Sequence, residues 1–332
     1  MWPITKIEKA CETALETLGD AVSHSHKFLT NYQVVKDDFC KEIYPNIGKI
    51  EPNLSDHGEI HIQDVLLNAY SLLEDFFESD DQKYETYSPL ELYVLCMAIL
   101  VHDIGNIHGR AGHERRLTEV FNPTKFPHID RSEMKVIIDI AKAHGGLGDT
   151  LSTLNHDQLY GHQIKSPNIA SLVRFADELA EGPQRTSRYM IEKGLIAQDS
   201  IVYHQYASIL KKPAIIQNNI VLEYDIVVNE YSEVELEALL KITYKRIEKL
   251  NFERIYCGQY SEHIQKLRKV IVKMAFYEEK ESFDPIDIDT KLTELELSNL
   301  ECQGFKSSDK DASIHEILTI IKHFCKGNKN NV

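Results

Sequence analysis

The stretch SPLELYVLCMAILVHD, residues 88–103, constrains the fold more than any other part of the chain. Nearly every side chain in it is apolar, so a helix formed here has no face suited to water. Ser88 is a natural N-terminal cap, and Pro89 is tolerated in the first turn of a helix. We therefore predict a buried, central helix. It ends at His102 and Asp103, an imidazole beside a carboxylate.

Helical patterns dominate the chain around this segment. Apolar residues recur at helical spacing from residue 4 to about residue 44, and again almost throughout residues 57–181. Within the second stretch, residues 62–76 carry one strong apolar stripe. Residues 281–305 are ambiguous. Further helical patterns occupy residues 233–255, 262–279 and 314–324.

One part of the chain has a different residue composition. β-branched and aromatic residues cluster in residues 200–210 and 213–228, around an Asn218-Asn219 turn, and we expect a small antiparallel sheet there. The sequence thus predicts a mainly α protein with a small antiparallel β insertion and C-terminal helices. Its four predicted regions are a helical lead-in (1–48), a helical domain (49–195), a small sheet with helices packed on the core (196–283) and a C-terminal segment of unclear role ending in a helix (284–332).

The charge balance argues against some functions. The chain has 37 Lys and Arg against 52 Asp and Glu, a formal net charge of −15. This disfavours an extended nucleic acid as partner, because binding to its phosphates is favoured by clustered Lys and Arg side chains. The six cysteines include no C-x-x-C pair, which indicates reduced thiols. No apolar run of about 18 residues and no signal-peptide pattern occur, so we expect a soluble, cytoplasmic protein without a membrane partner.

Histidines are concentrated in one third of the chain. Nine of the fifteen lie in residues 57–162, although any one of them alone is most simply a helix cap or a core residue. His61 precedes the apolar stripe, and His144 ends another apolar helix. Asp177 lies inside the apolar sequence SLVRFADELA. A buried carboxylate is costly without a cation or hydrogen bonds, so these positions together indicate a metal site.

This arrangement resembles the HD superfamily of metal-dependent phosphohydrolases over roughly residues 50–190. The superfamily pattern is a His on an early helix, a His-Asp doublet that ends a later buried helix, and a distant Asp. Dinuclear members have two further histidines in between. The matching residues are His61, His102, Asp103 and Asp177 for the common pattern, and His113 and His144 for the dinuclear one. The resemblance implies an HD-type helical bundle for the predicted domain at 49–195.

Two local sequences bear on the resemblance. HDIGN at residues 102–106 is close to the HDIG frequent in the superfamily, but Asn106 stands where some dinuclear members have a Lys. LVRFADELAEGPQR, residues 172–185, looks like the segment carrying the last Asp in exopolyphosphatase-related HD domains and in those found with chaperone-type ATPases.

The resemblance implies hydrolysis at a metal site. Imidazole and carboxylate ligands suit one or two divalent ions, among Mn²⁺, Fe²⁺, Ni²⁺, Co²⁺, Zn²⁺ and Mg²⁺. A bound ion lowers the pKa of its water toward ~7, so a metal-bound hydroxide is the expected nucleophile, and Asp103 would bridge two ions. We expect a metal-dependent phosphohydrolase, of phosphodiesterase or nucleotidase type, that cleaves a phosphoester or phosphoanhydride of a nucleotide-type substrate.

Further residues are candidates for proton transfer and substrate binding. His57, one helical turn before His61, is a candidate general acid or phosphate contact. It joins Asp103 and Arg185 in the expected catalytic set, while Asn106 and Glu114 are candidates to orient ligands. The cations near the ligands are candidates to bind phosphate, Arg185 foremost: Arg110, Arg115, Arg116, Lys142, Arg185 and Arg188.

Two alternatives stay open at this stage. A diiron HD-fold oxygenase would contain a redox-active pair of irons. A regulatory or scaffold protein would bind metal or nucleotide without turnover. In that case the sheet near residues 201–228 and the C-terminal helices would form a surface for a protein partner or a second copy of the chain.

Overall fold

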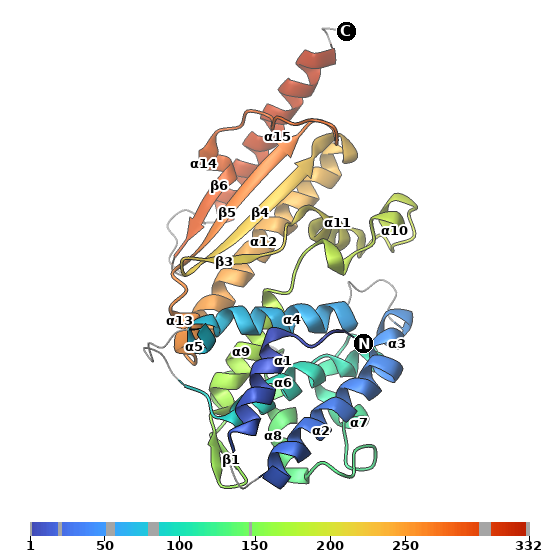
Figure 1. Cartoon of the computed structure of the whole chain (residues 1–332). Coiled ribbons are helices and arrows are strands. Elements are labelled where there is room, and N and C mark those ends of the chain that lie inside the picture. Colours follow the sequence, from blue (N-terminus) through green and yellow to red (C-terminus); the bar gives the residue numbers. More distant parts are fainter. Residues whose placement is uncertain are drawn as a thin grey trace. The chain divides into compact units, whose positions relative to one another are not determined.

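In the computed structural model the chain forms two compact units (Figure 1). The first unit contains Met1–Ala180 and Tyr256–Lys266, and the second contains Glu181–Ile255 and Leu267–Val332. The fold is mainly α, as the sequence predicts. The structure describes residues 2–18, 22–50, 57–78, 86–145, 148–298 and 307–329.

The first unit is a bundle of helices. The longer ones are α1 (Lys6–Glu16), α2 (Val22–Asp38), α4 (Glu59–Leu72), α6 (Pro89–Val101), α8 (Arg131–Lys142) and α9 (Ser166–Glu178). The shorter ones are α3 (Tyr44–Ile50), α5 (Glu74–Glu78), α7 (Leu117–Val120) and α13 (Glu262–Gln265). A small hairpin, which the sequence does not predict, joins β1 (Asp157–Leu159) to β2 (His162–Ile164).

The predicted central helix is α6. Ser88 and Glu91 form a reciprocal capping box at its start, and the helix packs against α1, α8 and α9. Among the described residues, the segment Pro89–His108 is the one helix with the length and apolar composition of a membrane span. However, 94% of that window is buried inside the protein. Core helices pass the same test, and burial here identifies α6 as one of them.

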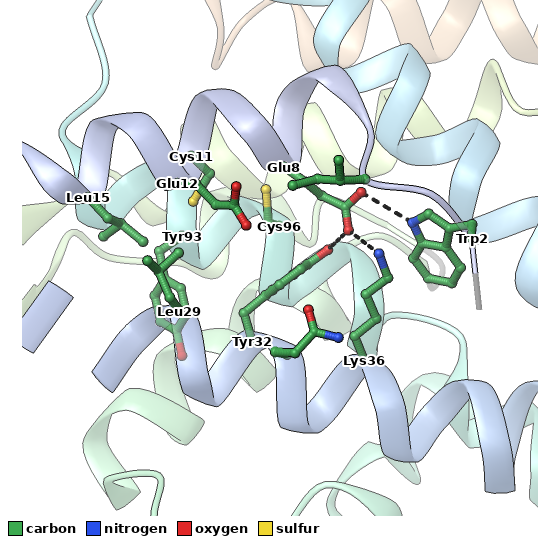
Figure 2. A pocket seen from close by; sticks show the side chains of 12 residues that line it. Trp2, Glu8, Cys11, Glu12, Leu15, Leu29, Tyr32, Lys36, Tyr93 and Cys96 are labelled. Carbon is green, nitrogen blue, oxygen red and sulfur yellow. Dashed lines mark hydrogen bonds and ion pairs between the residues drawn. The ribbon is translucent and has the colours of Figure 1, made fainter. Parts of the chain in front are cut away.

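Helices α4 and α9 pack on each other beside α6. The predicted stripe of α4 is buried, including Ile62, Val65 and Leu66. The side-chain amide of Asn68 donates a hydrogen bond of 3.1 Å to the carbonyl oxygen of Ala176, which fixes the register of the two helices. Helices α1 and α2 enclose a cavity of about 230 Å³ together with α6 (Figure 2).

The second unit contains a sheet in the order β3-β4-β5-β6. The outer pairs are antiparallel, whereas β4 and β5 are parallel. The strands are β3 (Ala214–Ile216), β4 (Asn219–Val227), β5 (Lys269–Tyr277) and β6 (Glu294–Leu297). The helices are α10 (Arg188–Glu192), α11 (Ile201–Ile209), α12 (Glu233–Cys257, whose end belongs to the first unit), α14 (Thr290–Thr293) and α15 (Ser307–Lys329).

Helix α12 provides the crossover that two parallel strands require. Helix α15 lies along it, joined by the ion pairs Lys310–Glu248 and Lys322–Glu233. Figure 1 shows both helices behind the sheet.

The antiparallel hairpin β3–β4 lies within the predicted sheet region. Gln217 and Asn218 make its turn with positive φ angles of 49° and 60°, so the turn lies one residue earlier than predicted. Residues 200–210 were expected in the sheet, and this is wrong, since 201–209 form helix α11. Strand propensity is a weak preference that packing overrides, and here His204, Tyr206 and their neighbours are buried in a helix.

The helix predicted over residues 262–279 is also wrong for most of its length. Its start is α13, but residues 269–277 form strand β5. Side chains alternate along β5, with Val270, Val272 and Phe276 buried on one face. The ambiguous segment 281–305 contains α14 and β6, and its residues 299–305 lie outside the described part of the chain.

Candidate metal centre

The first unit brings the six predicted ligands together at the end of α6. His61 lies on α4 and Asp177 on α9, whereas His102 and Asp103 directly follow α6. His113 begins the short 3-10 segment His113–Arg115, and His144 lies two residues after α8. Two overlapping groups of side chains are arranged so that each can hold a metal ion. We call them the first ligand group (His61, His102, Asp103 and Asp177) and the second ligand group (Asp103, His113 and His144).

The atoms of the first ligand group lie at ligand spacing. Nε2 of His61 is 3.1 Å from Oδ1 of Asp177 and 3.4 Å from Oδ2 of Asp103. Nε2 of His102 is 3.5 Å from Oδ2 of Asp103 and 3.7 Å from Oδ1 of Asp177. Two ligand atoms bound at about 2.1 Å to one ion lie roughly 3.0–3.5 Å apart in tetrahedral or octahedral geometry. The measured spacings therefore suit one ion.

The second ligand group uses the other oxygen of Asp103. Oδ1 lies 3.1 Å from Nε2 of His113 and 3.7 Å from Nε2 of His144. Asp103 is 2% exposed, and it presents one oxygen to each group. A carboxylate in this position can bridge two cations.

Hydrogen bonds fix how three ligand rings point. Nδ1 of His102 lies 2.8 Å from the carbonyl oxygen of Ile99, and Nδ1 of His144 lies 2.5 Å from that of Ala141. Nδ1 of His113 lies 3.2 Å from the carbonyl oxygen of Arg110. A ring that donates Nδ1–H to a carbonyl keeps the lone pair of Nε2 for a metal. Each acceptor carbonyl lies three residues before its histidine. Those of Ile99 and Ala141 are in the last turns of α6 and α8, and that of Arg110 is in the loop before His113.

Histidine ring nitrogens without a hydrogen-bond partner show whether a cation fits the site. Both ring nitrogens of His61 and Nε2 of His102 are buried without a hydrogen-bond partner, and such groups cost free energy. Imidazole and carboxylate donors are those that borderline divalent ions prefer. An ion at the first ligand group would satisfy Nε2 of His61 and Nε2 of His102, so the donor set fits a divalent metal.

The charges of the site favour a cation as well. Burial raises the pKa values of Asp103 and Asp177, but the surrounding histidines outweigh it and hold both well below the usual range. Burial lowers the pKa of His102, but the two carboxylates outweigh it and raise this pKa to about 9. Burial and the charge on His102 lower the pKa of His144 to about 4. The carboxylates of Asp103, which is buried, and Asp177, which is partly exposed, thus stabilise a positive charge at the centre.

The structure gives a steric reason for the glycine of the HDIG sequence, Gly105. It lies in the 3-10 segment Ile104–His108 that follows the doublet. A Cβ atom at this position would lie 2.0 Å from the carbonyl oxygen of His113. Glycine is therefore required for the backbone carrying His113 to approach the end of α6. Sequence reasoning missed this role, since the contact joins residues eight positions apart.

Three predicted neighbours touch the ligands. Nδ1 of His57 lies 2.5 Å from Oδ2 of Asp103, and His57 is buried. The side-chain amide of Asn106 donates to the carbonyl oxygen of Asp103 at 3.0 Å. Oε2 of Glu114 lies 3.4 Å from Nδ1 of His113.

The predicted cations of the first unit lie in different surroundings. One guanidinium nitrogen of Arg110 is 3.4 Å from Nε2 of His113. The side chain of Arg115 is 87% exposed, near Glu114, and Arg116 donates to the carbonyl oxygen of His108. Lys142 lines a cavity of about 290 Å³ between α7 and α8.

The other two predicted cations belong to the second unit. Arg185 is 6% exposed and forms an ion pair of 3.4 Å with Glu181. Arg188 pairs with Glu230 at 3.1 Å and with Glu192 at 3.5 Å. Their role in phosphate binding stays a prediction.

Comparison with known proteins identifies the family. The HD-CE family model matches residues 51–253, which is more than half of the chain and includes all six ligands. No curated protein and no solved structure matches the chain. The expected kinship with HD-type domains is thus confirmed, and the chain belongs to the HD-CE family.

Proposed function

We propose that this protein is a metal-dependent phosphohydrolase that cleaves a phosphoester or phosphoanhydride of a nucleotide-type substrate. The observation that carries the proposal is the position of Asp103, which turns one oxygen toward each ligand group. When bound, a pair of divalent ions supplies a water of pKa ~7 and offsets charge on the phosphoryl oxygens. The membership in an HD-type family supports the same reaction class.

The chain's own residues have distinct roles in this proposal. His57 orients Asp103 through their hydrogen bond, and its other ring nitrogen, Nε2, is the candidate to pass a proton to the leaving oxygen. Arg110 binds a phosphate, because its half-exposed side chain reaches the ligands. The other predicted phosphate contacts are Arg115, Lys142, Arg185 and Arg188.

The substrate class follows from charge. A chain of net charge −15 suits a small phosphorylated molecule held at a local site better than an extended nucleic acid. The five cysteines within the described residues are free thiols, which fits a reducing cytoplasm. We also retain as proposals the kinship with exopolyphosphatase-related and chaperone-associated HD domains, and a homo-oligomer or protein partner at the C-terminal region.

Metal content tests the site directly. Wild type loaded with Mn²⁺ should hold one or two ions per chain, and Asp103→Ala should hold none, since the substitution removes a ligand of both groups. Asp139→Ala is the control, because it removes a carboxylate of the same unit that pairs with Lys135 on the surface of α8. Metal retained by Asp103→Ala would refute the site.

A screen for phosphate release then tests the reaction. Loaded wild type should release phosphate or a nucleoside monophosphate from a panel of nucleotides and cyclic nucleotides, and Asp103→Ala should not. Saturable nucleotide binding without any product, even at high enzyme concentration, would instead identify a binding protein.

A further inference from the structure

The guanidinium of Arg110 lies at the second ligand group. One of its terminal nitrogens is 3.4 Å from Nε2 of His113, 3.8 Å from Oδ1 of Asp103 and 3.3 Å from Oδ1 of Asn106. Two of the three side chains of that group are thus in contact with a permanent positive charge.

The contact occupies an atom that a metal needs. His113 donates from Nδ1 to a carbonyl, so its Nε2 carries a single lone pair, which accepts from Arg110. In the first ligand group, by contrast, Nε2 of His61 and of His102 make no hydrogen bond. The two groups therefore differ, because a guanidinium competes with an ion at the second group only, among the contacts of the described residues.

The side chain of Arg110 can move away from the second ligand group. It is 49% exposed, and it follows Gly109, whose φ of 99° marks a turn. A guanidinium binds phosphate through paired, charge-assisted hydrogen bonds. A phosphate brought to the centre therefore forms stronger hydrogen bonds with Arg110 than His113 and Asp103 do.

We propose that Arg110 occupies the second ligand group until a phosphate draws it away, so that the second ion and the anionic substrate bind cooperatively. The proposal rests on the proposed function, since it takes the centre to bind metal and phosphate. Coupling between two ligands is reciprocal. Phosphate should therefore tighten the second ion, and the second ion should tighten phosphate, while the first ion responds little.

Titration of the full-length chain with Mn²⁺ tests this inference. Paramagnetic resonance counts free Mn²⁺ and detects two adjacent ions by their coupling. Arg110→Gln should bind the second Mn²⁺ about tenfold more tightly than wild type, and the first with unchanged affinity. Arg131→Gln, which removes one exposed charge from the first turn of α8, should behave as wild type.

A second arm adds inorganic phosphate, below the concentration at which manganese phosphate precipitates. Phosphate should tighten the second Mn²⁺ by about tenfold in wild type and clearly less in Arg110→Gln. The inference would be overturned if Arg110→Gln and wild type bound the second Mn²⁺ equally well, or if Arg131→Gln bound it as tightly as Arg110→Gln does. It would also be overturned if phosphate tightened the second Mn²⁺ equally in all three proteins. In those outcomes a bound first ion leaves the proposed function standing, whereas no bound Mn²⁺ in any protein overturns both.

Discussion

Gly105 lies two residues beyond Asp103, and the lack of a side chain there decides where His113 can lie. The carbonyl oxygen of His113 occupies the space that a Cβ would take. The neighbour is backbone and cannot rotate away, so any larger residue must displace the segment that carries His113. The second ligand group is thus more sensitive to this position than the first.

Gly105→Ala tests this dependence. We expect the free energy of unfolding to fall by roughly 1–3 kcal/mol, the usual cost of overpacking, and the second Mn²⁺ to be lost before the first. Urea unfolding and Mn²⁺ stoichiometry measure the two effects. Gly48→Ala is the control, because a Cβ there meets nothing within 4 Å and alanine favours helix α3. Equal stability and stoichiometry in both variants would contradict this account.

The ligands themselves could be predicted from sequence, whereas their surroundings could not. His61, His102 and Asp177 are recognisable because imidazoles and carboxylates are out of place on apolar helices. Arg110 resembles any other charged loop residue, and its contact with His113 depends on how the turn after Gly109 folds. Side-chain direction in a turn carries no periodic signal in the sequence.

At the scale of elements, a buried ion pair joins α1 to α2. Glu8 closes the capping box at Thr5 and also accepts hydrogen bonds from Trp2, Tyr32 and Lys36 (Figure 2). Burial raises the pKa of Glu8, but the bonds from Lys36, Tyr32 and Thr5 outweigh it, so the pKa lies below its usual value. Both charged partners are buried, so removing one leaves the other without compensation.

Glu8→Gln should therefore destabilise the first unit by roughly 3 kcal/mol at pH 7. A folded pKa below the unfolded value of about 4.3 stabilises the protein above that value, and this contribution is lost as pH falls through the folded pKa. Urea unfolding at pH 7 and below pH 4 should show the loss on acidification in wild type and a smaller one in the variant. Glu12→Gln, at an exposed position of α1, is the control; a similar effect of both substitutions would refute the role of Glu8.

Elements were predictable where their pattern is local. Helix α6 is apolar over its whole length and is capped by Ser88, and both features are visible in the sequence. Strand β5 was not, because it begins soon after the short helix α13 and its lysines fit a helical pattern. Its parallel pairing with β4 is made with residues about 50 positions away, and tertiary contacts of that kind decide between helix and strand in short apolar segments.

At the scale of the whole molecule, the metal ligands lie entirely in the first unit, and they join helices that are far apart in sequence. An ion held by His61, His102 and Asp177 would tie α4, α6 and α9 together. Their ligand pattern and the apolar helices around it indicate a helical domain at residues 49–195 from sequence alone. The return of residues 256–266 to the first unit depends on contacts such as the ion pair between Lys266 and Asp75, which no local pattern predicts.

Because binding to the folded state alone stabilises a protein, Mn²⁺ should raise the unfolding temperature of the first unit. At about 100 times its dissociation constant an ion contributes ~2.7 kcal/mol, or roughly 5 °C or more for a domain of this size. The single tryptophan, Trp2, is buried in the first unit, so its fluorescence follows that unit rather than the second. Mn²⁺ should shift this transition in wild type and in Asp139→Ala, and a chelator should reverse the shift. Asp103→Ala should show none, and an equal shift there would mean that Mn²⁺ stabilises the chain at some other place.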